Sequence, residues 1–401
     1  MPQSDGERPL TQYDIVIIGG GPSGSVTAYL TAKQGLRVCL IDKANFPRDK
    51  LCGGLLTKRT KTLFERIFER KWDENIITEK DEMVMFSKNK FPEGITQSAP
   101  LYLTMRYDFD ACLLDMAREA GADIRTGMKV SAFDLANTEL TLASGERLSY
   151  GCLVGADGVN SQVAKLLYGE SFNRETIGFA LELEVPREDM PEQGDIVEID
   201  MSPCDWGYGW TFPKKHSFTV GVGGQHRKNP DMKANLSRYM AGKGLDMRAY
   251  KVKGHFLSRG DFRNPPGRGR VILVGDAAGL GDPLTGEGIC NAMQSAEAAA
   301  RALVESLRDG HPNSVLQNYQ RDYNEVTKTL KYARVLCWLI YPRKIRRYLA
   351  SFYTGSGRLQ RGYLDILSGE LEYSALFALF AGQALRALKS LPLRLVGIRR
   401  G

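Results

Sequence analysis

Apolar, β-branched runs alternate with helical segments at the start of the chain. Residues 13–18 (YDIVII) have the pattern of a strand that is buried on both faces in a parallel sheet. A helical segment follows at residues 25–35, and a second apolar strand at residues 37–42 (RVCLID) ends with Asp42. Strand, helix and strand in this order predict a parallel sheet that is covered by helices.

The same kind of element returns twice further along the chain. Residues 153–158 (LVGADG) and 270–276 (RVILVGD) are apolar strands that end in glycine and aspartate. Helical patterns occupy residues 106–122 and 290–303. These segments are expected to join the first strands in one interrupted domain.

The stretches between these segments have another pattern. Residues 82–106 and 176–259 are rich in strand signals, and residues 313–401 are helical in pattern. Turn residues separate the short strands of the second stretch, which predicts an antiparallel sheet. Its expected strands are residues 179–185, 195–201, 208–213, 217–223 and 250–256.

Composition excludes several classes of protein. With 401 residues, 43% hydrophobic and 25% charged, the chain is typical of a globular protein. Its 7 cysteines include no C-x-x-C pair, which argues against an iron–sulfur cluster or zinc ribbon and favours free thiols in a reducing compartment. No secretory signal or transmembrane helix is expected, so we predict a cytoplasmic protein. The histidines show no metal-ligand spacing; His216, His226 and His255 are expected to be solvated or hydrogen-bonded, and no metal is assigned.

The positive charge is concentrated at the C-terminal end. The formal net charge is +7, and from Lys331 onward 13 basic residues stand against 3 acidic ones. A basic tail on a near-neutral body argues against nucleic-acid binding. Residues 333–353 and 373–401 combine apolar runs with basic clusters, which favours peripheral contact with the inner face of a membrane. In the alternative, their apolar faces cover a substrate tunnel and their charges are solvated.

A glycine-rich turn follows the first strand. Gly19, Gly21 and Gly24 form G-x-G-x-x-G, a pattern that permits a tight turn and the close approach of a pyrophosphate to the helix N-terminus. Asp42, at the end of the next strand, is placed to accept hydrogen bonds from a ribose. A dinucleotide site is predicted; a purely structural turn is the alternative. The motif itself does not distinguish FAD from NAD.

Two later segments decide between these cofactors. Asp157-Gly158 and Gly275-Asp276 end strands, and a small-residue helix follows the second of them. A carboxylate at a strand end can bind a ribityl hydroxyl, while glycines and a helix N-terminus can approach the carbonyl edge of a flavin. Together with the first turn, these segments resemble the FAD-binding fold of the p-hydroxybenzoate hydroxylase superfamily, in which Arg106 matches a cofactor-contacting arginine.

This resemblance implies FAD as the cofactor, with Asp276 near the ribityl chain, Arg106 near the pyrophosphate and Val130 beside the adenine. The cofactor-binding residues that we expect are Gly19, Gly21, Ser23, Gly24, Asp42, Lys43, Arg48, Leu51, Cys52, Gly53, Gly54, Arg106, Val130, Asp157, Gly158, Gly275, Asp276, Gly286, Gly288 and Ile289.

Two further motifs narrow the resemblance. K-x-C-G-G at Lys50–Gly54 and Y-x-W-x-F-P at Tyr208–Pro213 are similar to those of the geranylgeranyl reductase family. That family saturates isolated double bonds of isoprenoid chains, so the resemblance implies an oxidoreductase that acts on an isoprenoid lipid. Asp205 and Trp206 depart from the family pattern, which commonly has proline and a small residue there; this bears on the loop shape and the substrate choice.

The aromatic motif suggests how such a site would work. Tyr208, Trp210 and Phe212 have strand spacing and therefore share one face. Aromatic faces can stabilise the positive charge that develops when an isolated alkene is protonated, without acting as bases. Cys52 could contact the substrate or help to deliver a proton. We therefore expect Cys52, Tyr208, Trp210 and Phe212 as catalytic residues; the alternative is that the aromatics form a sheet core and the thiol is an inert apolar group.

The resulting architecture is α/β plus α+β. We predict a discontinuous Rossmann-like FAD-binding domain (residues 1–81, 107–175 and 260–312), an inserted antiparallel-sheet substrate domain (82–106 and 176–259) and a C-terminal helical region (313–401). A long apolar pocket is expected where the two domains meet.

Other functions and the source of electrons stay open at this stage. An FAD-dependent monooxygenase or halogenase has the same fold, although Y-x-W-x-F-P differs from the W-x-W-x-I-P signature of halogenases. An electron-transfer flavoprotein is a third reading, which the lack of a cysteine cluster weakens. Because no second nucleotide motif is visible, the electron donor is NADPH, a ferredoxin or a quinol-linked protein partner.

Overall fold

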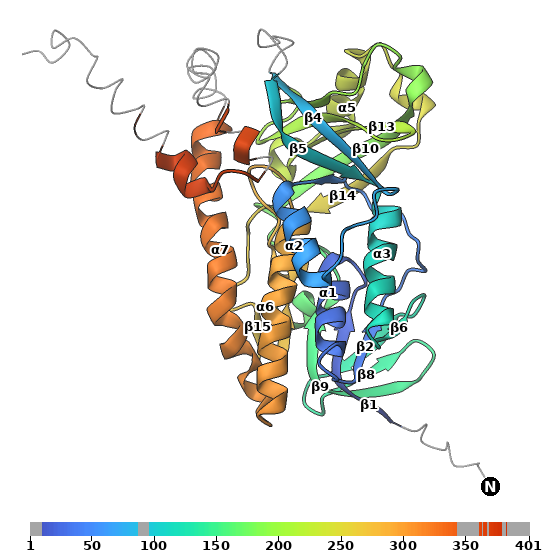
Figure 1. Cartoon of the computed structure of the whole chain (residues 1–401), viewed down its shortest axis with the longest axis vertical. Helices are drawn as coiled ribbons and strands as arrows, with labels where there is room; N and C mark the ends of the chain where they lie inside the picture. Colours follow the sequence, from blue (N-terminus) through green and yellow to red (C-terminus); the bar gives the residue numbers. More distant parts are fainter. Residues whose placement is uncertain are drawn as a thin grey trace, which may run out of the picture.

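Two eight-stranded sheets form the body of the protein. The computed structural model describes residues 10–86, 96–342, 361–362, 364–366, 369–378 and 382. The first sheet and its helices occupy the lower part of Figure 1, and the second sheet lies at its upper end. The interrupted fold expected from the sequence is therefore present, because three separate stretches of chain build the first sheet.

The core of the first sheet is parallel. Its strand order is β15-β16-β9-β1-β2-β6, and β1 (Thr11–Ile18) pairs in parallel with β2 (Val38–Ile41) and β9 (Arg147–Gly155). The apolar run of β1 is buried on both faces from Ile15 to Ile18, as its sequence predicts. The remaining strands are β6 (Asp123–Arg125), β7 (Val130–Asp134), β8 (Glu139–Leu142), β15 (Gly267–Arg268) and β16 (Val271–Leu273).

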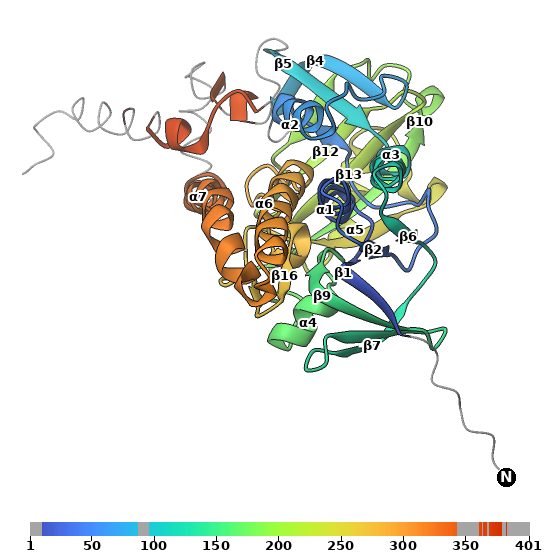
Figure 2. The same cartoon turned by 60° about the horizontal axis from the view of Figure 1, so that its bottom comes forward.

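Helices cover one face of this sheet in a row. α3, α1 and α6 lie side by side, and α7 packs on the outer side of α6 (Figures 1 and 2). α1 is almost entirely buried, and its threonine hydroxyls are satisfied within the helix: Thr27 donates to the carbonyl of Ser23, and Thr31 to that of Thr27. The helices are α1 (Pro22–Ala32), α2 (Lys58–Phe68), α3 (Arg106–Glu119), α4 (Gln162–Tyr168), α5 (Met232–Ala241), α6 (Ile289–Arg308) and α7 (Val315–Ile340).

The second sheet has the order β14-β10-β13-β12-β11-β4-β5-β3. Its pairs are antiparallel, as expected, with one exception: β11 and β4 run in parallel, because the chain passes through the first domain between them. An apolar core lies between one face of this sheet and α5. The strands are β3 (Leu55–Leu56), β4 (Ile77–Phe86), β5 (Thr96–Thr104), β10 (Gly178–Pro186), β11 (Val197–Asp200), β12 (Gly207–Pro213), β13 (Ser217–Gln225) and β14 (Lys253–Leu257).

Strand pairing departs from the predicted region boundaries at one place. β3 and the start of β4 fall within residues 1–81, which were assigned to the cofactor domain, yet both strands pair in the second sheet. The sequence did not reveal this because β3 is only two residues long and has no periodic pattern of its own. The rest of the division into three regions stays a prediction.

The C-terminal region is helical where it is described. α7 spans 26 residues, and Tyr373, which follows it at a distance in the chain, donates a hydrogen bond to Asp282 at 2.6 Å. Most of the predicted basic tail, within residues 343–360 and 383–401, lies outside the described residues. Across the part of the chain that the structure describes, no helix is both long enough and apolar enough to cross a bilayer.

Candidate functional site

A cavity of about 490 Å³ lies where the two sheets meet. The first sheet contributes the carboxyl ends of its central strands and the N-termini of α1 and α6, and the second sheet contributes β12 and β14. Except for Gly24 and Gly275, all of the expected site residues line this one cavity. The structure therefore brings together residues from sequence segments that lie far apart.

The glycine-rich turn shapes one end of the cavity. A Cβ on Gly19 would lie 2.3 Å from the carbonyl oxygen of Ala156, and one on Gly24 would lie 1.8 Å from the carbonyl oxygen of Gly19. These two positions exclude any side chain, because backbone atoms cannot move aside easily. A Cβ on Gly21 would meet only the guanidinium tips of Arg48 and Arg106, at 3.7 and 4.0 Å. Gly21 thus keeps the backbone open toward the cavity, as pyrophosphate binding requires.

The N-terminus of α1 faces this opening. Among the described residues, no side chain caps it, and Pro22 stands at its first turn. Its first backbone N–H groups are therefore available to an anion. At the end of β2, Asp42 accepts N–H bonds from Gly20 at 2.7 Å and Ala44 at 2.8 Å and lines the cavity. Asp42 therefore borders the space for a cofactor, and its role toward a ribose stays a prediction.

Two arginines share a buried carboxylate beside the glycine turn. Arg106 binds Asp110 through two hydrogen bonds of 2.6 Å, and Arg48 lies 3.1 Å from the same carboxylate. Burial lowers the pKa of Arg106, but Asp110 and the Cys52 thiol more than offset this and raise it above its ordinary value. Two fixed cations next to an open helix N-terminus form a site for a diphosphate.

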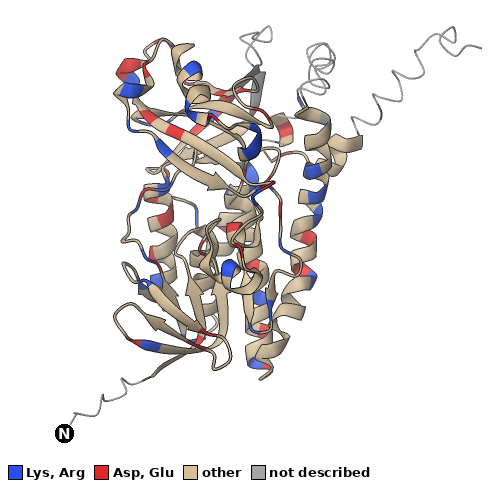
Figure 3. Cartoon of the chain, turned by 180° about the vertical axis from the view of Figure 1, so that it is seen from behind, with Lys and Arg blue, Asp and Glu red and all other residues tan. Residues whose placement is uncertain are grey.

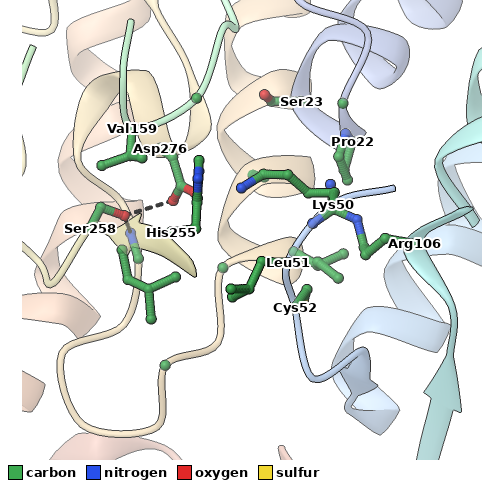
Figure 4. Close-up of a pocket in the computed structure, with 18 of the residues that line it drawn as sticks. Pro22, Ser23, Lys50, Leu51, Cys52, Arg106, Val159, His255, Ser258 and Asp276 are labelled. Carbon is green, nitrogen blue, oxygen red and sulfur yellow. Dashed lines mark hydrogen bonds between the residues drawn. The ribbon is translucent and has the colours of Figure 1, made fainter. Parts of the chain in front are cut away.

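Two basic side chains that sequence reasoning missed project into the same space. Lys50 extends from its loop toward His255 and Asp276 (Figure 4). Burial lowers the pKa of Lys50 to about 8 and that of His255 to about 4, and the neighbouring cations add to both effects. His255 was expected to be a solvated or satisfied histidine, but it lines the cavity. Its strand could be predicted, whereas the face that it presents to the first domain could not.

The opposite wall begins with Asp276 and the N-terminus of α6. Asp276 accepts a hydrogen bond from the Ser258 hydroxyl at 2.6 Å (Figure 4). Gly286 has a φ of +74°, and Gly288 precedes α6; no side chain among the described residues caps that helix. The carbonyl edge of a flavin could therefore approach backbone N–H groups here, as the glycines and the helix pattern predicted.

Asp157 has a local task that the sequence did not reveal. Its carboxylate accepts bonds from the Ser161 hydroxyl at 2.5 Å and from the Gln162 N–H at 2.6 Å, which fixes the start of α4. Asp157, Gly158 and Val130 all line the cavity. The direct cofactor contacts that were expected of these three residues stay predictions.

The aromatic row forms the apolar wall of the cavity. Tyr208, Trp210 and Phe212 all line it from β12. The Trp210 ring lies over the neighbouring strand β13, where a Cβ on Gly221 would come within 2.3 Å of it. The glycines of β13 therefore make room for the indole. The Tyr208 hydroxyl donates to the carbonyl of Thr285, and burial raises its pKa, so it is poorly suited to releasing a proton.

The Cys52-Gly53-Gly54 segment packs directly on this row. A Cβ on Gly53 would lie 2.6 Å from the Phe212 ring and 3.5 Å from Nε1 of Trp210. Gly54 has a φ of +69°, and a Cβ there would lie 2.0 Å from the carbonyl oxygen of Thr104. A side chain at either position would clash with its neighbours, so both residues have to be glycine. Cys52 lines the cavity beside Arg106, and its sulfur accepts the N–H of Gly54 at 3.3 Å.

Trp206, one of the two residues that depart from the family pattern, shapes the surface beside the aromatic row. Trp206 adopts a φ of +52°, which is unusual for a residue with a side chain. Its ring stacks on Tyr341 with centroids 6.1 Å apart and meets Trp338 edge-on at 4.7 Å. Trp206 therefore ties the β12 loop to α7, and Tyr341 lines the cavity behind it.

The donor set of this site fits FAD. The glycine turn, the α1 N-terminus and the two arginines can hold a pyrophosphate, and Asp42 can bind a ribose. The α6 N-terminus and the Cys52 segment border the remaining polar part of the cavity. Three or more metal-ligating side chains do not gather anywhere in the described ranges.

Comparisons with known proteins agree with this geometry. Residues 12–332 match a family described as the FAD binding domain. A protein of Nicotiana tabacum named geranylgeranyl diphosphate reductase, chloroplastic, is 30% identical over 326 residues, covering 74% of this chain and 67% of its own length. Digeranylgeranylglycerophospholipid reductase 1 of Methanococcoides burtonii is 27% identical over 348 residues, covering 80% and 82% of the two chains.

A solved structure has the same fold. It is the structure of a geranylgeranyl bacteriochlorophyll reductase-like protein from Thermoplasma acidophilum, with a TM-score of 0.77 and 22% sequence identity. The match covers 96% of this chain and 99% of the other.

The glycine turn provides a matched pair of variants. We expect Gly24→Ala to destabilise the protein by about 1–3 kcal/mol or more, because its Cβ would clash with the Gly19 carbonyl. Gly21→Ala should leave the melting temperature of the FAD-free protein unchanged and weaken FAD binding, because its Cβ faces open space. Thermal unfolding and fluorescence titration with FAD measure the two effects. Wild-type FAD affinity in Gly21→Ala would contradict this assignment.

Proposed function

The chain belongs to the FAD-binding family that it shares with the geranylgeranyl reductases, and we propose that it uses FAD to saturate isolated double bonds of a geranylgeranyl or related polyisoprenoid chain. The observation that carries this proposal is the continuity of the cavity. A single space is lined by the dinucleotide cradle at Gly19 and Ser23 and by the aromatic wall at Trp210 and Phe212.

The names of the two relatives support the substrate class. Both name a geranylgeranyl chain, attached to a diphosphate in one protein and to a glycerophospholipid in the other. The chain is the part that the two named compounds share, so a related site is expected to recognise the chain. The wall of Tyr208, Trp210 and Phe212 is suited to that task, because it offers shape and aromatic faces to a hydrocarbon chain.

The reaction adds one hydride and one proton across the double bond. Reduced FAD, when bound, supplies the hydride. An isolated alkene has no carbonyl group to accept negative charge, so protonation first or in concert places positive charge on the more substituted carbon. The faces of Trp210 and Phe212 stabilise this charge by roughly 0.5–2 kcal/mol each and exclude the water that would trap it.

The proton needs a donor at the cavity wall. Cys52 borders both the cofactor end and the aromatic row, whereas the Tyr208 hydroxyl is engaged with a backbone carbonyl. We therefore assign substrate contact and proton delivery to the Cys52 thiol, and the thiolate that this leaves takes up a proton from solvent before the next turnover. An external reductant of the predicted kinds, which are NADPH, a ferredoxin and a quinol-linked partner, returns electrons to FAD after each turnover.

The activity can be tested without knowing that reductant. FAD-loaded protein reduced anaerobically with dithionite should add two hydrogens per double bond to geranylgeranyl diphosphate and to a digeranylgeranyl glycerophospholipid, as measured by mass spectrometry. Unchanged lipids together with oxygen-dependent hydroxylation of another substrate would instead indicate a monooxygenase.

Trp210 separates catalysis from cofactor retention. We expect Trp210→Ala to lower prenyl reduction by at least about tenfold, the equivalent of roughly 1.4 kcal/mol of lost charge stabilisation, while FAD stays bound. Trp210→Phe should keep much of the activity, because it retains an aromatic face. Reduction kinetics and the FAD content of the purified variants measure the two effects. If Trp210→Ala lost activity and bound FAD to the same extent, the aromatic row would have only a packing role.

We also propose that the protein works at the inner surface of a membrane. Tyr332, Val335 and Trp338 of α7 are 38%, 50% and 67% exposed. Their three-residue spacing places them on one side of the helix. Lys331 and Arg334 directly precede Tyr332 and Val335, and the end of α7 next to the second sheet carries basic positions (Figure 3). Apolar side chains flanked by cations suit an anionic lipid surface.

The position of this face also suits a lipid substrate. Trp338 contacts Trp206, and Gly207, the next residue, lines the cavity. A prenyl chain leaving a bilayer at α7 would therefore be close to the apolar part of the cavity. This arrangement would supply the substrate without exposing its chain to water.

The charges on α7 allow a direct test. Replacing Lys331 and Arg334 together by glutamine should weaken binding to vesicles that contain anionic lipid by about 1 kcal/mol per charge at low salt. Vesicle co-sedimentation measures this, and the matched control replaces Lys233 and Arg238 of α5 by glutamine. If both double variants lost the same vesicle affinity, or if the wild type did not bind the vesicles, the proposed membrane contact of α7 would be wrong.

A further inference from the structure

The face of the second sheet that meets the cofactor domain carries a buried carboxyl group next to the aromatic row. Strand pairing places Trp210 opposite Gly221, Gly221 opposite Glu182, and Glu182 opposite Lys253. Directly paired residues of antiparallel strands share a face, so all four belong to one row. Because Gly221 has no side chain, Glu182 is the next side chain beyond Trp210.

Glu182 contacts the backbone of the predicted catalytic segment. Its side chain is 3% exposed, and Oε1 accepts the N–H of Cys52 at 2.8 Å. Its other oxygen, Oε2, is buried and has no hydrogen-bond partner among the described residues. An arrangement of this kind is costly for a folded protein, because a carboxylate in an apolar interior is strongly disfavoured unless it is paired.

A buried lysine holds the other side of the same segment. Lys214, directly after β12 and also 3% exposed, donates from Nζ to the carbonyl of Gly53 and, at 2.7 Å, to that of Thr104. The N–H of Cys52 thus donates to the carboxyl group of Glu182, and the C=O of Gly53 accepts from the amino group of Lys214. The two bonds lie on either side of the Cys52–Gly53 peptide, which packs on Phe212 and Trp210.

We propose that Glu182 and Lys214 form a buried ionisable clamp that positions the Cys52–Gly53 segment against the aromatic wall, and that protonation of Glu182 loosens it. Both residues act through the segment and touch no part of the cavity themselves. The proposal deepens the proposed function, on which it rests for the role of Cys52, whereas the clamp itself is a property of the protein without substrate.

The electrostatics of the clamp allow it to switch near neutral pH. The pKa of Glu182 is raised to about 7. Burial is the main cause and Glu184 adds to it, whereas the Cys52 N–H, Lys214 and Lys253 act in the opposite direction. Burial likewise lowers the pKa of Lys214 to about 8, opposed by Glu184, Cys52 and Glu182. Lys253 in turn pairs with Asp49 at 3.1 Å. As the pH falls through about 7, Glu182 takes up a proton. The hydrogen bond that it accepts from the Cys52 N–H then becomes weaker, because the acceptor is no longer negatively charged.

A second carboxylate on the same strand provides a matched control. Glu184 has its side chain on the same face as Glu182, but it accepts hydrogen bonds from Ser217 at 2.6 Å and Thr219 at 2.7 Å. Its hydrogen bonds go to hydroxyl groups of β13 and do not reach the Cys52 segment. Replacing Glu184 by glutamine therefore leaves the hydrogen bonds of the clamp in place and removes only a charge that raises the pKa of Glu182.

Hydrogen exchange of the Cys52 amide tests the clamp in the FAD-loaded protein. In the wild type, we expect its protection factor, corrected for the intrinsic effect of pH, to fall roughly fivefold from pH about 8 to about 6, on either side of the pKa of about 7. Glu182→Gln keeps an acceptor but cannot ionise, so its protection factor should be low and should lack the rise from pH about 6 to about 8 that the wild type shows; Lys214, with a pKa of about 8, only loses its charge over that rise. Glu184→Gln should keep the change of protection with pH, with its midpoint moved to lower pH, because Glu184 no longer raises the pKa of Glu182.

Prenyl reduction supplies a second readout. The kcat of Glu182→Gln should lose the pH dependence that the wild type shows in this range, while its FAD affinity stays unchanged. Protection of Cys52 that does not vary with pH in the wild type, or that changes equally in Glu182→Gln and Glu184→Gln, would overturn the clamp even if the protein reduces prenyl chains. Protection that behaves as expected in a protein that reduces no lipid would instead leave the clamp standing and overturn the proposed function.

Discussion

The close contact between the Cys52–Gly54 segment and the second sheet is the constraint on which the site depends. Gly53 meets the Phe212 ring, and Gly54 meets the carbonyl of Thr104, at distances where any side chain would clash. Across the sheet, Gly221 leaves space for the Trp210 ring. The cavity keeps its shape because backbone and aromatic rings touch here without intervening side chains.

This contact also explains why buried charges gather where the two sheets meet. A loop that packs so closely needs its backbone N–H and C=O groups satisfied, and no regular strand pairing is available for Cys52 and Gly53. Glu182 and Lys214 supply the missing partners. At the cofactor end, Asp110 serves Arg48 and Arg106 in the same way, by fixing two cations that an anionic cofactor can use.

The cavity divides its tasks between the two sheets. The first sheet and its helix N-termini offer cations and backbone donors, which suit a charged dinucleotide. The second sheet offers aromatic faces, which suit a hydrocarbon chain and the positive charge that forms on it. The reaction requires both properties at one place, and a boundary between domains provides them without burying either set of groups in an unsuitable core.

The sequence by itself determined the elements whose reason is local. The glycine turn, the acid at the end of β2 and the strand spacing of Tyr208, Trp210 and Phe212 follow from backbone geometry. The order of strands and helices predicted the fold class, and FAD was predicted from the resemblance that the glycine turn carries together with Asp157-Gly158 and Gly275-Asp276. The structure alone decided what Glu182 of β10 and His255 of β14 meet: the Cys52 backbone in one case and the cavity in the other. Leu181 and Leu183 alternate with Glu182 and Glu184, a pattern that normally indicates one solvated face, yet here both faces are covered. His255 and Glu182 became part of the site only through the packing of a distant loop, because alternation along a strand says which residues share a face and never what that face will meet.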